Sequence, residues 1–168
     1  MRLRTLALVT IFAIAPVRGS ARPWKGVAPG RSTQAEVIER FGEPSTRARR
    51  GARTVLAYAG EQALEGTKQA QFHVDAAGTV QEITVFVSEP LDGATVEGTY
   101  GKPPQRSFVE DTFQKVWLYP QQGVTVFFDK DGNVAAFSYT AGTRAKAPAS
   151  AEARPAAAER AAPPSGAR

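Results

Sequence analysis

Cysteine is absent from the 168-residue chain, and histidine occurs only once, as His73. Without a thiol the chain can form no disulfide, hold no Cys-ligated zinc and use no cysteine nucleophile. It also lacks the cysteine that carries the lipid anchor of an envelope lipoprotein. The single histidine has no partners at the spacing of a metal site or of a Ser-His pair. We therefore expect no metal, no cofactor and no enzymatic activity.

The chain also lacks an apolar run of the ~20 residues that a membrane-spanning helix needs. Its apolar segment at residues 6–14 is about nine residues long and follows Arg2 and Arg4. A short apolar segment behind basic residues is typical of a secretory signal peptide. Small residues at positions 19–21 predict cleavage after Ala21. We expect a periplasmic or secreted protein that neither spans a membrane nor carries a lipid anchor.

The middle of the chain carries no net positive charge, although the formal net charge of the whole chain is +5. Residues 23–140 hold 12 basic and 14 acidic residues, a net charge of −2. The excess of basic residues lies at the two ends. The composition therefore gives no support for nucleic acid as a partner.

Residues 141–168 contain twelve alanines and four prolines and no aromatic or branched aliphatic residue. Such a segment cannot bury enough apolar surface to fold, so we predict a disordered, weakly basic tail. The predicted organisation is a signal peptide at 1–21, a folded domain at 22–140 and the tail at 141–168.

The best-formed motif is GRSTQAEVIERFGEP at residues 30–44. Thr33 and Glu36 have the spacing of a capping box at a helix start. Gly42 and Pro44, which follow the apolar helical face, are typical of a helix end. The motif predicts a helix of about nine residues, which is too short to be stable unless it packs on another element.

The same motif recurs 59 positions later. Matched positions are Thr33 and Asp92, Val37 and Val96, Phe41 and Tyr100, Gly42 and Gly101, and Pro44 and Pro103. Many coincidences at one offset indicate an internal repeat. We therefore predict repeat one at 24–88 and repeat two at 89–140.

Alternating apolar residues predict strands after each helix. The predicted strands are 54–59, 69–75, 80–88, 113–119, 123–129 and 134–139. The sequences DAAG at 75–78 and DKDG at 129–132 favour hairpin turns. The resulting expectation is an α+β fold of two tandem helix-plus-antiparallel-hairpin-sheet repeats, with the helices packed on one face of an antiparallel sheet.

The motif resembles that of the SmpA/OmlA (BamE-like) family of envelope proteins, in a stretch that covers about residues 24–140. Its residues are Gly30, Thr33, Val37, Phe41, Gly42 and Pro44. In tandem, the arrangement is similar to the β-lactamase inhibitor protein fold. These resemblances imply an exported protein-binding module, acting in outer-membrane biogenesis or as an inhibitor of a secreted enzyme.

A sheet face that no helix covers offers apolar contact to a partner. Aromatic residues dominate binding hot spots. The candidate protein-binding residues are Trp117, Tyr119, Phe127, His73 and Tyr58. Alternation alone does not tell which face the helices cover, so core positions for the strand aromatics remain the alternative.

Four arginines, Arg47, Arg49, Arg50 and Arg53, form the one local concentration of charge in the folded part. They lie between the first predicted helix and strand. The cluster is a candidate contact for an anionic surface, with a solvated loop as the alternative.

Two groups of polar residues fit a structural role better than a chemical one. Asp129, Asp131 and Asn133 alternate like calcium ligands, but the glycine and the glutamate of an EF-hand are not at their positions. Glu110 and Asp111 are neighbours in a loop and do not show the convergence that acid–base catalysis needs.

The function that we expect is a non-catalytic protein-interaction module of the envelope that binds an envelope or secreted protein. The alternatives are an inhibitor of a secreted hydrolase and a binder of lipid or cell-wall fragments.

Overall fold

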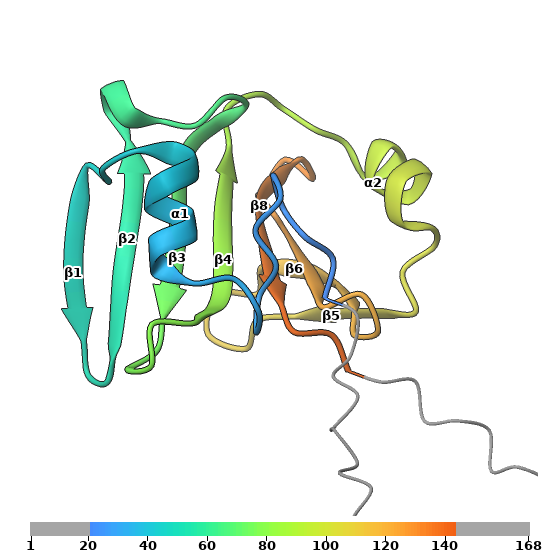
Figure 1. Ribbon diagram of the computed structural model, residues 1–168. Coiled ribbons are helices and arrows are strands. Elements are labelled where there is room, and N and C mark those ends of the chain that lie inside the picture. Colours follow the sequence, from blue (N-terminus) through green and yellow to red (C-terminus); the bar gives the residue numbers. More distant parts are fainter. Residues whose placement is uncertain (1–20, 144–168) are drawn as a thin grey trace, which may run out of the picture.

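Eight strands form one antiparallel sheet in the computed structural model, which describes residues 21–143 (Figure 1). Across the sheet the strands follow the order β1-β2-β3-β4-β8-β7-β6-β5. Their bounds are Thr46–Arg50 (β1), Arg53–Ala59 (β2), Thr67–Val74 (β3), Val80–Val87 (β4), Gln105–Phe108 (β5), Lys115–Tyr119 (β6), Val124–Phe128 (β7) and Val134–Thr140 (β8). Almost all of the predicted signal peptide and almost all of the predicted tail lie outside the described residues.

The predicted α+β fold class is wrong. The described part is 43% strand and only 15% helix. Its two α-helices, α1 (Gln34–Phe41) and α2 (Gly93–Tyr100), have eight residues each, and the 3-10 helix η1 (Gly60–Gln62) has three. Two helices of about two turns are too short to form a helical layer over eight strands. The protein is therefore a mostly β structure built on one long sheet, and not a pair of helix-and-sheet repeats.

The prediction also missed the two strands at the edges of the sheet. All residues of β1 and β5 are exposed, so neither strand has a buried side that would produce apolar alternation. Each pairs with one neighbour only, β1 with β2 and β5 with β6. Edge strands that bury no side chain leave no periodic signal in the sequence.

Local signals at the helix ends and hairpins are confirmed. Thr33 caps α1 in a capping box with Glu36, and Asp92 accepts the amide proton of Thr95 at the start of α2. Gly42 and Gly101 end the two helices with φ values of 78° and 84°, a conformation that favours glycine. The predicted hairpins are present as β3–β4 and β7–β8.

The hydrophobic core lies on the face of the sheet that both helices contact, which we call the covered face. Phe41 of α1 packs on Tyr58 and Phe72, with ring centroids 6.0 and 5.6 Å apart. Tyr100 of α2 packs on Tyr119 at 5.5 Å. Val37 and Val96 of the helices and the inward side chains of β2, β3, β4, β6, β7 and β8 join the same cluster.

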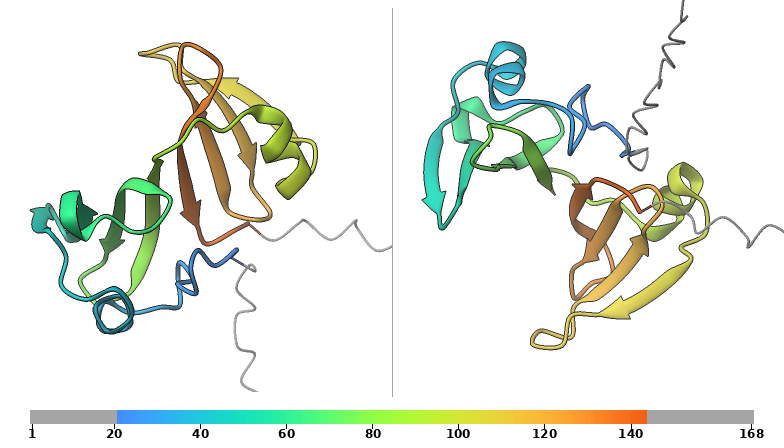
Figure 2. Two further views of the ribbon diagram at one scale, coloured as in Figure 1. Left: turned by 90° about the horizontal axis from the view of Figure 1, so that it is seen from above. Right: turned by 60° about the horizontal axis from the view of Figure 1, so that its bottom comes forward.

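The register places the alternate residues of each strand on the opposite side, which we call the open face. One row of paired residues crosses all eight strands. In order it contains Thr46, Ala57, Gln71, Thr84, Ser138, Thr125, Leu118 and Gln105. The sheet is strongly twisted, so that β1–β4 and β5–β8 run in different directions (Figure 2).

Candidate protein-binding face

Three of the predicted binding residues belong to the core, so their assignment to an exposed interface is wrong. Tyr58 is 0% exposed, Tyr119 2% and Trp117 6%. All three lie on the covered face. The hydroxyl groups of the tyrosines donate to the carbonyl oxygens of Gly42 and Gly101, at 2.8 and 2.9 Å. Burial raises the pKa of both tyrosines above the ordinary value.

Trp117 packs against Phe128, with ring centroids 4.7 Å apart. The cations of Arg106 and Lys115 lie over its indole ring, 4.9 and 5.0 Å from the centroid. Its Nε1 atom is buried and has no hydrogen-bond partner in the part of the chain that the structure describes. The Trp117 indole is therefore part of the core and is covered by two cations, so it is not available to contact a partner protein.

Phe127 and His73 lie on the open face and are both half-buried. They do not meet, because β4 and β8 separate β3 from β7. His73 pairs across the strands with Val55 and Glu82. Burial, opposed by Glu82 and reinforced by Arg53 and Arg50, lowers the pKa of His73 below its ordinary value. His73 is therefore neutral at physiological pH.

A second row of paired residues on the open face is largely apolar. It runs from Phe86 on β4 through Ala136 on β8 and Phe127 on β7 to Val116 on β6. Phe86 and Phe127 are half-buried and keep part of their rings exposed, whereas Ala136 and Val116 are each 6% exposed between their neighbours. Leu118 lies beside this row, on the central row of the open face. Sequence reasoning named only Phe127, because alternation shows a period of two and not which side is covered.

Charge is confined to one half of the open face. Arg50, Arg53 and Glu82 lie in the half formed by β1–β4, where Ser138 of β8 donates to the Glu82 carboxylate at 2.8 Å. Among the described residues, the half formed by β5–β8 carries no charged side chain. Its residues are Ala136, Ser138, Thr140, Thr125, Phe127, Val116, Leu118, Gln105 and Ser107. An uncharged surface with half-exposed aromatic and aliphatic groups is the kind that forms the centre of protein interfaces.

The four predicted anion-contact arginines lie on the β1–β2 hairpin and not in a loop. Alternation along β1 places Arg47 and Arg49 on the covered side and Arg50 on the open side, where it pairs with Arg53. Arg47 is already bound to Glu43, at 2.6 Å between Nη2 and Oε2. The four side chains are exposed, but they do not form one patch.

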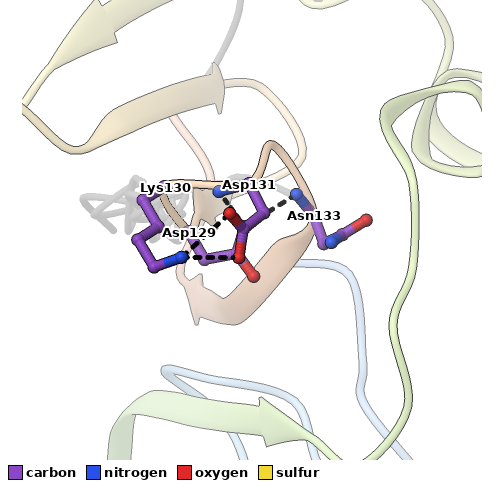
Figure 3. A network of polar contacts seen from close by, with 4 residues as sticks. All are labelled: Asp129, Lys130, Asp131 and Asn133. Atoms are coloured by element: carbon purple, nitrogen blue, oxygen red, sulfur yellow. Dashed lines mark hydrogen bonds and ion pairs between the residues drawn. The ribbon is translucent and has the colours of Figure 1, made fainter.

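The Asp129 turn is built by its backbone bonds. Asp129 Oδ1 accepts the amide protons of Asp131 and Asn133, both at 2.9 Å, and Lys130 contacts the Asp131 carboxylate (Figure 3). Asp75 forms the same turn with Ala77 and Thr79. The aspartates therefore stabilise hairpin turns. Within residues 21–143, no group of three or more acidic or histidine side chains is placed to hold a metal ion, and no helix is long and apolar enough to cross a membrane.

Comparisons with known proteins support the fold and give no activity. No protein-family model matches the chain, and no curated protein matches it. Among solved structures, the chain is similar to a DUF4309 family protein, YjgB, from Bacillus subtilis subsp. subtilis str. 168. The TM-score is 0.53 at 15% sequence identity, over 73% of this chain and 87% of that protein. A likeness at this identity concerns the fold alone.

Proposed function

We propose that this chain is an exported, non-catalytic protein-interaction module of the bacterial cell envelope. The observation that supports the proposal is the uncharged half of the open face, formed by β5–β8, together with the apolar row that runs into it from Phe86 of β4 to Val116 of β6. Apolar and hydroxyl side chains on a rigid sheet offer contact area that costs little conformational entropy on binding. The signal-peptide pattern supports the compartment, and the motif at residues 30–44 supports a relationship to SmpA/OmlA-like proteins.

The test is in-cell photo-cross-linking of the full chain. A photoreactive residue at Phe127 reports on the open face, and one at Glu39, which is exposed on α1, serves as the matched control. We expect a specific protein adduct at position 127 and none at position 39. Equal adducts at both positions, or none at either, would contradict the proposal.

The identity of the adduct separates the alternatives. An envelope-assembly protein supports an assembly or maintenance role. A secreted hydrolase points to inhibition, and its activity should then fall stoichiometrically as purified chain is added. A small lipid or glycan adduct without a protein would replace the proposal with a ligand-binding function.

A further inference from the structure

β5 is an edge strand whose second side is open. It pairs with β6 through Gln105 to Phe108, and no other described strand adjoins it. All four of its residues are exposed. A row of unpaired backbone amides and carbonyls at an edge is a template for another strand.

The opposite edge of the same sheet is protected, and β5 is not. β1 holds Arg47, Arg49 and Arg50, and charged side chains on an edge oppose strand pairing. The one charged residue of β5, Arg106, is turned back onto its own molecule. Its guanidinium lies 2.9 Å from Glu97 and over the Trp117 ring. The outer side of β5 therefore carries no free charge.

The hairpin that contains β5 presents two large apolar side chains to solvent. Phe108 is 64% exposed and Phe113 80%, and they are the exposed large hydrophobic residues of the described part. Phe113 has a φ of 52°, which is strained for an aromatic residue, and its amide donates to Val109 at 2.7 Å. Strained backbone conformations are concentrated at functional sites, and at Phe113 the strained residue is one whose aromatic side chain faces solvent.

The backbone pattern shows which groups of β5 are free. The Val109 amide bonds the carbonyl of Gln114, across the hairpin. Because amides alternate in direction along a strand, Ser107 also bonds toward β6, whereas Arg106 and Phe108 point their amides and carbonyls outward.

We propose that β5 pairs antiparallel with β5 of a second copy of this chain, around a two-fold axis at Ser107. This register makes the outward groups of Arg106 bond those of Phe108 of the second copy, twice by symmetry. The side chains of Arg106 in one copy and Phe108 in the other then lie next to each other on the covered side. The Phe108 ring therefore packs beside the Arg106 guanidinium, which is already held in place within its own copy. The small Ser107 side chains meet at the axis, and the sheet continues through both copies.

Charge complementarity favours a second copy over a foreign strand. The pairing brings the turn that follows β5, with Glu110 and Asp111, to the same end of the paired strands as the segment that precedes β5 in the second copy, which contains Lys102. All three side chains are exposed, and none forms an ion pair within residues 21–143. The two-fold axis brings the complementary groups together twice. Because β5 is short, we expect a weak, concentration-dependent dimer.

Cysteine cross-linking tests the register directly, since the chain has no cysteine of its own. Ser107 faces itself as a non-hydrogen-bonded pair, with a Cα separation of about 4.5 Å that a disulfide can bridge. Under mild oxidation the full chain with Ser107→Cys should become a covalent dimer. Ala48→Cys, at the equivalent exposed position of β1, is the matched control and should stay monomeric. Failure of Ser107→Cys to cross-link, or equal cross-linking of both variants, would overturn the proposal.

Sedimentation equilibrium of the full chain tests the contact without a covalent bond. We expect the apparent mass to rise toward twice the monomer mass with concentration, and Ser107→Lys to abolish that rise by placing two like charges at the axis. Ala48→Lys should leave it unchanged.

Charge reversal tests the ionic contact. Lys102→Glu should weaken association at least tenfold, and Glu110→Lys with Asp111→Lys should restore it. A wild-type chain that stays monomeric, or one whose association ignores Ser107→Lys, would refute the pairing.

Discussion

Tyr58 donates its hydroxyl proton to the carbonyl oxygen of Gly42, which ends α1, over 2.8 Å. Tyr119 makes the matching bond to Gly101 at the end of α2, over 2.9 Å. In each case a tyrosine of a strand bonds the carbonyl of the glycine that follows a helix, a group for which the helix itself has no hydrogen-bond donor. The two short helices are therefore attached to the sheet at their C-terminal ends as well as by their apolar side chains.

Tyr58→Phe and Tyr119→Phe should each lower the free energy of unfolding by about 1 kcal/mol, the usual net value of one hydrogen bond. The aromatic packing is retained, so the loss reports the bond alone. Urea unfolding monitored by circular dichroism measures it. A stability equal to that of the wild type in both variants would show that the bonds to Gly42 and Gly101 are not needed to hold the helices.

Two glycines of α2 should respond in opposite directions to alanine. A Cβ at Gly93 would lie 2.7 Å from the Trp117 ring, whereas one at Gly98 meets nothing within 4 Å. Gly98→Ala should stabilise the protein by up to about 1 kcal/mol, through helix propensity. Gly93→Ala should destabilise it by roughly 1–3 kcal/mol, because the indole must move. Thermal unfolding of the two variants side by side checks the sign. If both Gly93→Ala and Gly98→Ala stabilise the protein, the Trp117 ring moves aside without a cost in free energy.

Signals that act over a few residues predicted the local structure correctly. Thr33 with Glu36, Gly42 and the Asp75 turn each satisfy backbone groups within their own segment, so their effect does not depend on the rest of the chain. Edge strands and fold class depend on which segments pair, and β1 shows no apolar pattern that would reveal its pairing. The α+β prediction failed for this reason: it counted two helices and six strands, and it did not see one sheet of eight.

The candidate site was predicted only in part, for a related physical reason. Period-two alternation separates Trp117 and Tyr119 from Leu118 but does not say which set the helices touch. The aromatic set was chosen because aromatics favour interfaces, yet aromatics also fill cores best. Phe86 and Ala136 could have been found from the alternation in β4 and β8, had the pairing of these strands been known.

Acid should weaken the protein partly through Asp75. The amide of Thr79, with the Gln81 side chain and the Ala77 amide, holds the pKa of this carboxyl below its ordinary value of 3.8. A lowered pKa in the folded state means that the stabilisation is present above the ordinary value and is lost as pH falls through the lower one. The free energy of unfolding should therefore fall below about pH 4, and less steeply in Asp75→Asn.

Urea unfolding of the wild type and of Asp75→Asn across this pH range measures the two slopes. Equal slopes would show that the turn does not depend on the charge of Asp75.

The two faces of the sheet should separate stability from binding. Trp117→Ala removes a core side chain and should cost about 3–5 kcal/mol, a large part of the stability of a small domain. Phe127→Ala removes a half-buried ring from the open face and should cost about 1 kcal/mol, while it weakens trapping of the partner. Urea unfolding followed by circular dichroism, which does not depend on Trp117, gives the first quantity, and cross-linking from position 86 gives the second. A folded, stable Trp117→Ala chain beside an unfolded Phe127→Ala chain would mean that the core lies on the open face, and the proposed interface would then have to move to the side that carries the helices.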